Sequence, residues 1–154
     1  MSTLTLDQAD AIVDGALKAG RKVELHPLTV AVLDAGGHLV AFKRQDGSGI
    51  MRPEVAIGKA YGALGMGIST RLLRDRLADR PSFQAALAAA SQGRFIPVPG
   101  GVLIRDKGGA VLGAVGISGD TSDKDEYCAI AGIKAAGLAP DPAEPAPDWM
   151  HSRL

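Results

Sequence analysis

The chain has 154 residues, a formal net charge of zero and one cysteine. This length suits one domain whose core needs neither disulfides nor metals. The zero net charge, without a cluster of Lys and Arg on any predicted element, argues against a nucleic-acid-binding surface. The single cysteine, Cys128, excludes a framework of internal disulfides. No segment resembles a signal peptide or reaches the ~18 apolar residues of a membrane span, so we expect a cytoplasmic protein.

Aromatic residues make up only 4% of the chain, so small aliphatic side chains must build the core. Such side chains let helices and sheet approach closely, but each one buries little apolar surface. A chain of this size gains further burial by self-association, and we therefore expect a homo-oligomer.

The N-terminal segment predicts an amphipathic helix. Thr5 and Gln8 form a capping box, in which each side chain bonds to the backbone N–H of the other residue. Apolar residues follow at helical spacing from Ala9 to Leu17, and Gly20 marks the end of the pattern.

One phrase occurs twice: Asp-x-Gly-Gly between two apolar runs, in residues 30–42 and 102–115. Glycine supplies the positive φ that a tight turn needs, so each phrase predicts a β-hairpin. Helical patterns surround both hairpins, which predicts a single mostly antiparallel sheet with the first and last helices packed on it. Residues 95–98 predict a further short strand.

Three helices are predicted between the hairpins. Pro53 suits the first position of a helix that contains Lys59 and two glycines four residues apart, Gly58 and Gly62. Glycine inside a helix costs roughly 1 kcal/mol relative to alanine, so close packing or a ligand is the expected reason. Residues 70–78 and 82–91 predict two shorter helices.

Ser122 begins the last predicted helix with a second capping box. From residue 139 onward four prolines predict an extended tail without regular structure. The chain therefore divides into one domain, residues 1–138, and a Pro-rich tail, residues 139–154. The tip of the tail holds Trp149 beside Met150, and we expect both side chains to lie against protein.

Three ordered motifs resemble the GlcG/HbpS family, which includes the C-terminal domain of PduO-type proteins. They are residues 30–40, Lys59-Ala60 and residues 113–119, and the likeness spans roughly residues 4 to 138. The resemblance implies an α+β fold, a profilin-like sandwich with a mostly antiparallel five-stranded sheet, that assembles into homo-oligomers, often octamers. It also implies that some members bind haem, and that others belong to the breakdown of small organic acids and aromatics.

The polar junction after the second hairpin departs from the family, which has a glycine-rich stretch with one acidic residue there. Acids in the first turn stabilise a helix by ~0.3–1 kcal/mol each, which accounts for Asp123, Asp125 and Glu126. Asp120 precedes the helix and is not explained in this way. We interpret Asp120 as a general acid or base whose pKa is raised by partial burial, or as a residue that only completes a turn.

Two cations are predicted to hold an anionic small molecule: Arg52 through its bidentate fork and Lys59 as a point charge. In the alternative interpretation, the charged residues of this helix are ordinary solvated surface residues. We predict a pocket between the polar junction and this helix, with Asp120 and Lys59 as catalytic residues. The predicted substrate-binding residues are Arg52, Glu54, Ser118, Gly119, Thr121 and Ser122.

The remaining reactive side chains are Cys128 and three histidines. Cys128 lies among Ala and Ile, which is more typical of a buried small side chain than of a nucleophile. His38 lies in a hairpin turn, whereas His26 or His151 could each coordinate a haem iron. No spacing of zinc ligands occurs, so no metal site is predicted.

Two functions remain open. The first is a cytoplasmic small-ligand-binding protein that holds haem or a related tetrapyrrole as cofactor or ligand, and it rests on the family resemblance. The alternative is a cofactor-independent tautomerase, isomerase or hydrolase that acts on a small carboxylated metabolite of organic-acid or aromatic catabolism. A third interpretation is an assembly or regulatory subunit whose tail binds a neighbour. Neither nucleic acid nor a membrane is an expected partner.

Overall fold

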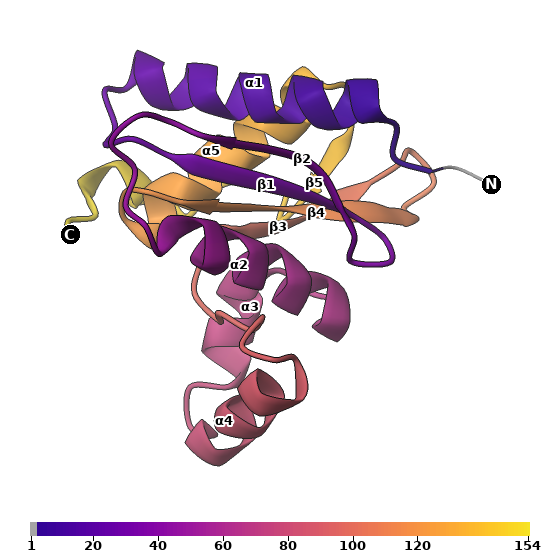
Figure 1. Ribbon diagram of the computed structural model, residues 1–154, viewed down its shortest axis with the longest axis vertical. Coiled ribbons are helices and arrows are strands. Elements are labelled where there is room, and N and C mark those ends of the chain that lie inside the picture. Colours follow the sequence, from indigo (N-terminus) through magenta and orange to yellow (C-terminus); the bar gives the residue numbers. More distant parts are fainter. Residues whose placement is uncertain (1–2) are drawn as a thin grey trace.

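A five-stranded antiparallel sheet with helices on both faces forms the centre of the protein (Figure 1). The computed structural model describes residues 3–154. The strands lie in the order β2-β1-β4-β3-β5, and every neighbouring pair is antiparallel. The strands are β1 (Thr29–Asp34), β2 (Leu39–Arg44), β3 (Gly101–Arg105), β4 (Val111–Ser118) and β5 (Ala139–Asp141). The helices are α1 (Leu6–Lys22), α2 (Arg52–Met66), α3 (Thr70–Arg76), α4 (Pro81–Ala90), α5 (Ser122–Ala135) and a short 3₁₀ turn, η1 (Trp149–His151).

Both Asp-x-Gly-Gly phrases form β-hairpins in this one sheet, as predicted. Asp34 Oδ1 accepts hydrogen bonds from the backbone N–H of Gly36 and His38, and Gly37 has a φ of +83°. In the second hairpin Asp106 Oδ1 accepts from Ala110 N at 2.9 Å. The aspartate therefore closes each turn from its side chain, while glycine supplies the left-handed backbone.

Helices α1 and α5 cover one face of the sheet, and their contact depends on small residues (Figure 1). A Cβ added at Gly132 of α5 would collide with the backbone oxygen of Ile12 in α1. The capping box of Thr5 and Gln8 is present at the start of α1. The predicted packing of the first and last helices on the sheet is confirmed.

Helix α2 covers the opposite face, and its two glycines have a packing reason. A Cβ at Gly58 would lie 2.6 Å from the Ile96 side chain, and one at Gly62 would lie 3.1 Å from Phe95. Residues 95–98 therefore cross α2 as irregular chain, and the prediction of a strand there is wrong. Phe95 and Ile96 pack against the helix, and residues 95–98 do not pair with the sheet.

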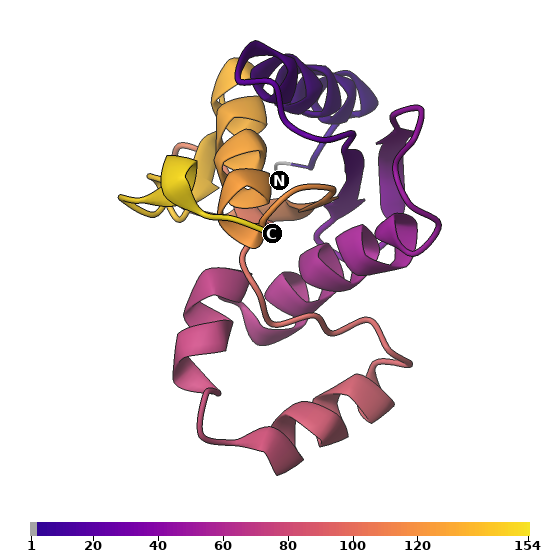
Figure 2. The same cartoon turned by 90° about the vertical axis from the view of Figure 1, so that its left-hand side faces the viewer.

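The fifth strand comes instead from the start of the tail. Residues 139–141 pair with β3, so the expectation that the prolines exclude regular structure is wrong at this point. Pro140 lies opposite Ile104 on an edge strand, where a missing N–H interrupts no further ladder. The rest of the tail runs back along α5, and α3 and α4 project away from the sheet as an arm (Figures 1 and 2).

The tail is held by side-chain contacts with α5. The Trp149 ring stacks on Tyr127 with centroids 3.7 Å apart, so the expected contact of Trp149 with protein is confirmed. Met150 is 58% exposed, which differs from the expectation for that residue. The Ser152 hydroxyl hydrogen-bonds with that of Thr121, and Thr121 rather than Ser122 is the N-cap of α5. Among the described residues, no helix combines the length and the apolar character needed to cross a membrane.

Candidate functional site

Lys59 lies inside the protein and is only 2% exposed. Its Nζ donates to the Ile117 backbone oxygen at 2.8 Å and to Asp125 Oδ2 at 3.1 Å, which ties α2 to β4 and α5. Gly100 packs directly against this side chain, since a Cβ there would lie 2.8 Å from Nζ. Burial lowers the pKa of Lys59 and raises the pKa of Asp125, while their mutual attraction opposes both shifts. Lys59 therefore has an internal carboxylate as its partner.

Asp120 does not face Lys59 across a pocket, because the two are joined through Asp125. The backbone N–H of Asp120 donates to Asp125 Oδ1 at 2.9 Å. The Asp120 carboxylate accepts from His26 N at 2.9 Å and from Thr121 N at 2.8 Å. Burial acts to raise its pKa, but these two donors and the charge of Lys124 outweigh burial and hold the pKa below its usual value. The expected raised pKa of Asp120 is wrong, and its carboxylate fastens the α1–β1 loop to the start of α5.

The other predicted substrate-binding residues lie in three places. Arg52, Ser118 and Gly119 lie together, and Arg52 Nη1 donates to the Ser118 hydroxyl at 3.0 Å. Thr121 and Ser122 cap and begin α5. Glu54 is exposed in the first turn of α2.

Glu126 is a buried acid that was interpreted as a helix-dipole residue. Its side chain is fully buried, and Arg71 Nε lies 3.2 Å from Oε2. Within residues 3–154 neither carboxylate oxygen accepts a well-formed hydrogen bond. Burial raises the pKa of Glu126 to about 7, against the attraction of Arg71. Local sequence gave no signal for this burial, because the tail that lies beside it is distant in the chain.

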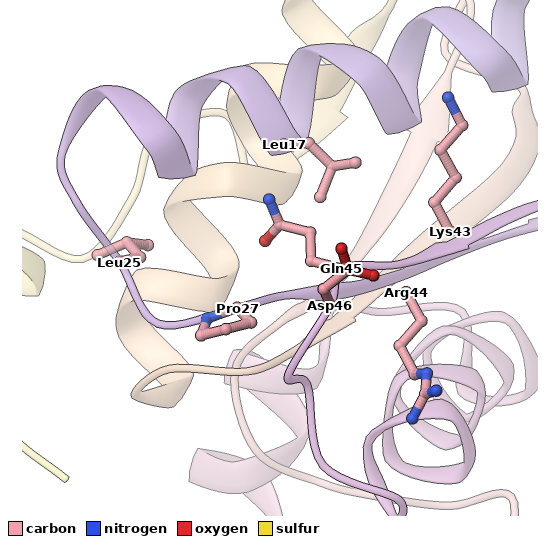
Figure 3. A pocket seen from close by; sticks show the side chains of 7 residues that line it. All are labelled: Leu17, Leu25, Pro27, Lys43, Arg44, Gln45 and Asp46. Carbon is pink, nitrogen blue, oxygen red and sulfur yellow. The ribbon is translucent and has the colours of Figure 1, made fainter.

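One cavity, of about 580 Å³, lies between α1 and the end of β2 (Figure 3). Two of its polar side chains already have partners: Lys43 Nζ bonds to Asp14 at 2.8 Å, and Gln45 Oε1 accepts from Leu28 N at 2.7 Å. Figure 3 shows Lys43 and Arg44 leaving the chain in opposite directions, so they do not converge on one ligand position. We do not regard this cavity as the functional site.

A second cavity of about 540 Å³ lies beside the start of α5, and we call it the tail cavity. Residues 149–154 of the tail line one side, and residues 23–26, Asp120 and Lys124 line the other. His26 and His151 therefore line the same cavity, and Met150 belongs to the wall that the tail forms. The sequence indicated each histidine separately, but the return of the tail along α5 depends on tertiary contacts that no local pattern encodes.

The remaining candidates lie elsewhere. Cys128 is buried, and burial raises the pKa of its thiol to about 12, which favours its interpretation as a small core side chain. His38 is exposed and contacts Asp34 in the hairpin turn. The described residues contain no group of three or more His, Cys, Asp or Glu side chains arranged to hold a metal ion.

Comparison with known proteins matches most of the chain. The family described as "Haem degrading protein HbpS-like" matches residues 4–134. An uncharacterised 15.0 kDa protein from the dhaT-dhaS intergenic region of Citrobacter freundii is 26% identical over 84% of this chain and 89% of its own length. Among solved structures, a double mutant of Streptomyces reticuli HbpS is 30% identical, with a TM-score of 0.73 and 87% of each chain covered. The PduOC haem complex is 23% identical, with a TM-score of 0.77 over 90% of this chain and 98% of that one, and shows the same fold.

These matches agree with the resemblance that the three sequence motifs indicated. They also agree with the order of strands and helices. The family match covers strands β1 to β4 and helices α1 to α5 except the last residue of α5, and it ends before β5. The tail cavity combines this shared part with residues 149–154, which follow it. On the length of the family match and the identity to HbpS, this chain belongs to the HbpS-like family of haem-degrading proteins.

Proposed function

We propose that the protein binds haem or a related tetrapyrrole in the tail cavity. The observation that carries this proposal is that two histidines, His26 and His151, are among the residues that line one cavity. Histidine is a common axial ligand of haem iron, and Met150 adds a thioether of the kind that ligates haem in cytochromes. His26 comes from the α1–β1 loop and His151 from η1, so two separate segments supply the ligands.

The rest of the lining suits the same ligand. A cavity of about 540 Å³ falls within the range of small-molecule and cofactor sites. Leu25 and Trp149 supply apolar surface for a flat ring, and Lys124 and Arg153 supply positive charge for its carboxylates. Haem would bring an iron centre capable of redox chemistry, whereas the residues of this chain bind and orient it. Two comparisons support the choice: the family is described as haem-degrading, and PduOC has the same fold in a haem complex.

The alternative enzyme is less well supported by the described residues. Lys59, the predicted binding residue for the anionic group of the substrate, is buried and paired with Asp125. The base of this enzyme was assigned to Asp120, whose carboxylate already accepts two backbone hydrogen bonds. The two side chains therefore do not present a free acid and a free cation to one substrate.

Titration of the purified protein with haemin, followed by absorption spectroscopy, tests the proposal. The wild type should give a sharp Soret band that saturates at about one haem per chain. His26→Ala and His151→Ala should each shift the band and weaken binding, and the double variant should lose most of it. His38→Ala is the matched control, because His38 lies outside the tail cavity, and should bind as the wild type does. A double variant with wild-type affinity and spectrum would contradict the assignment.

A further inference from the structure

A smaller cavity of about 260 Å³ adjoins the tail cavity, and we call it the Arg52 cavity. Both cavities are lined by His26 and Leu154, so a ligand in one can reach the other. The Arg52 cavity is otherwise formed by Pro27, the loop residues 47–49, Arg52 and Gly119. Its floor is close backbone packing, since a Cβ on Gly119 would collide with the backbone oxygen of Pro27.

Arg52 is the chemically significant group in this cavity. It is half-buried, and its guanidinium donates one hydrogen bond, from Nη1 to the Ser118 hydroxyl at 3.0 Å. Within the described residues no carboxylate oxygen lies within ion-pair distance of it, whereas the more deeply buried Lys59 has Asp125. A guanidinium carries five N–H donors in a planar fork, so most of the donors of Arg52 remain for a ligand.

The surrounding charges also favour an anion. Arg52 is the first residue of α2, and the N-cap Met51 makes no side-chain bond, so the positive end of the helix is uncapped at this point. The nearby acids have other partners: Asp125 pairs with Lys59, and Asp120 accepts from His26 N and Thr121 N. No Asp or Glu side chain is among the residues that line the cavity, so none neutralises Arg52 from inside it.

We propose that Arg52 binds a carboxylate in the Arg52 cavity through its planar fork. Two sources have this chemistry: a propionate of a tetrapyrrole bound in the tail cavity, and a free small organic acid. The first source rests on the proposed function, whereas the second does not. Arg52 is in either case a ligand-binding residue, and the Ser118 hydroxyl holds its guanidinium in position.

Three variants test the proposal: Arg52→Met, Arg52→Lys and, as the matched control, Arg76→Met. Arg76 is exposed in the last turn of α3 and does not line the Arg52 cavity. Affinity is measured for haemin and for haemin dimethyl ester, which lacks free carboxylates. A second arm measures binding of acetate and lactate by nuclear magnetic resonance titration.

If the carboxylate is a propionate, Arg52→Met should weaken haemin binding by about 10- to 100-fold, as expected for a charge-assisted bidentate contact. It should leave the affinity for the dimethyl ester unchanged. If the source is a free acid, the variant should abolish the acetate and lactate shifts that the wild type shows. Arg76→Met should behave as the wild type in both arms.

The outcomes separate this proposal from the proposed function. Absence of haemin binding by the wild type would contradict the haem proposal alone, and the acetate and lactate arm would then decide the role of Arg52. Wild-type affinity of Arg52→Met in both arms would overturn the carboxylate site. If Arg52→Met folds poorly, Arg52→Lys decides, because it keeps the charge but loses the fork. A several-fold loss of carboxylate affinity then supports the site, and unchanged affinity overturns it.

Discussion

The buried pair of Lys59 and Asp125 predicts that Lys59 contributes to the stability of the fold. Replacing Lys59 by Met would leave Asp125 buried without its counter-ion and the Ile117 oxygen without its donor. We expect the free energy of unfolding to fall by about 3–5 kcal/mol, the range typical of a broken buried pair. Urea unfolding followed by circular dichroism measures this loss.

Lys43 provides the control for this prediction, because its pair with Asp14 is exposed. Lys43→Met should leave the unfolding midpoint close to that of the wild type. The double variant Lys59→Met, Asp125→Leu should recover part of the lost stability, since apolar replacement of a whole buried pair is often tolerated. A Lys59→Met variant as stable as the wild type would show that the pair does not support the fold.

The raised pKa of Glu126 predicts that the stability of the fold depends on pH near neutrality. Its pKa in the folded protein is raised to about 7, whereas in the unfolded chain it is near 4.5. Between these values the folded state binds more protons, so the free energy of unfolding should fall as the pH rises from about 4.5 to 7. Arg71, Arg74 and Asp123 are the charged groups that act on this carboxyl.

The variant Glu126→Gln should remove this dependence, because the amide does not titrate. The quantity to compare is the difference in unfolding free energy between pH 5 and pH 8 for the wild type and the variant. Glu54→Gln, at an exposed acid of α2, should show the same pH dependence as the wild type. Equal pH profiles for the wild type and Glu126→Gln would rule out a shifted Glu126.

At the scale of elements, the tail beyond β5 is expected to serve the cavity more than the fold. Every residue of the three buried core clusters precedes residue 139, whereas residues 149–154 form one wall of the tail cavity. A chain ending at Pro142 should therefore fold and lose haemin affinity by at least tenfold. Thermal unfolding and the Soret titration measure the two effects.

A full-length variant separates the effect of the tail's position on haemin binding from the effect of its presence. Trp149→Ala removes the ring that stacks on Tyr127 and should loosen the tail without shortening it. Its haemin affinity should lie between those of the full chain and the truncated chain. Full haemin affinity after truncation would contradict the placement of the ligand in the tail cavity.

The elements that sequence predicted well are those whose signals are local. The hairpins depend on an aspartate and a glycine within one turn, and α1 depends on a capping box and an apolar stripe. Residues 95–98 and 139–141 were assigned wrongly because their structure is decided by partners far along the chain: the glycines of α2 and the free edge of β3. The site shows the same limit. The sequence indicates His26 and His151 as separate candidates, but their place in one cavity depends on the path of the tail.

At the scale of the whole molecule, apolar residues remain uncovered in places that suit self-association. Ile50 and Met51 are neighbours before α2 and are 88% and 70% exposed. Helix α4, in the projecting arm, has no buried residue although it is mostly apolar (Figure 2). Large exposed apolar patches mark interaction sites. We therefore predict a homo-oligomer, with an octamer as the state that the family resemblance implies.

Light scattering at micromolar concentration should give a mass several times the 15.8 kDa of one chain. The double variant Ile50→Asp, Met51→Asp should give a smaller species, because two buried charges would oppose an apolar contact. Lys18→Asp changes an exposed residue of α1 by a similar charge and should leave the mass unaltered. A wild-type mass of one chain would contradict the prediction.

Since His26 and His151 belong to the same chain, haem should still bind at about one per chain in the smaller species. A smaller species without haem would instead mean that a neighbouring subunit completes the tail cavity.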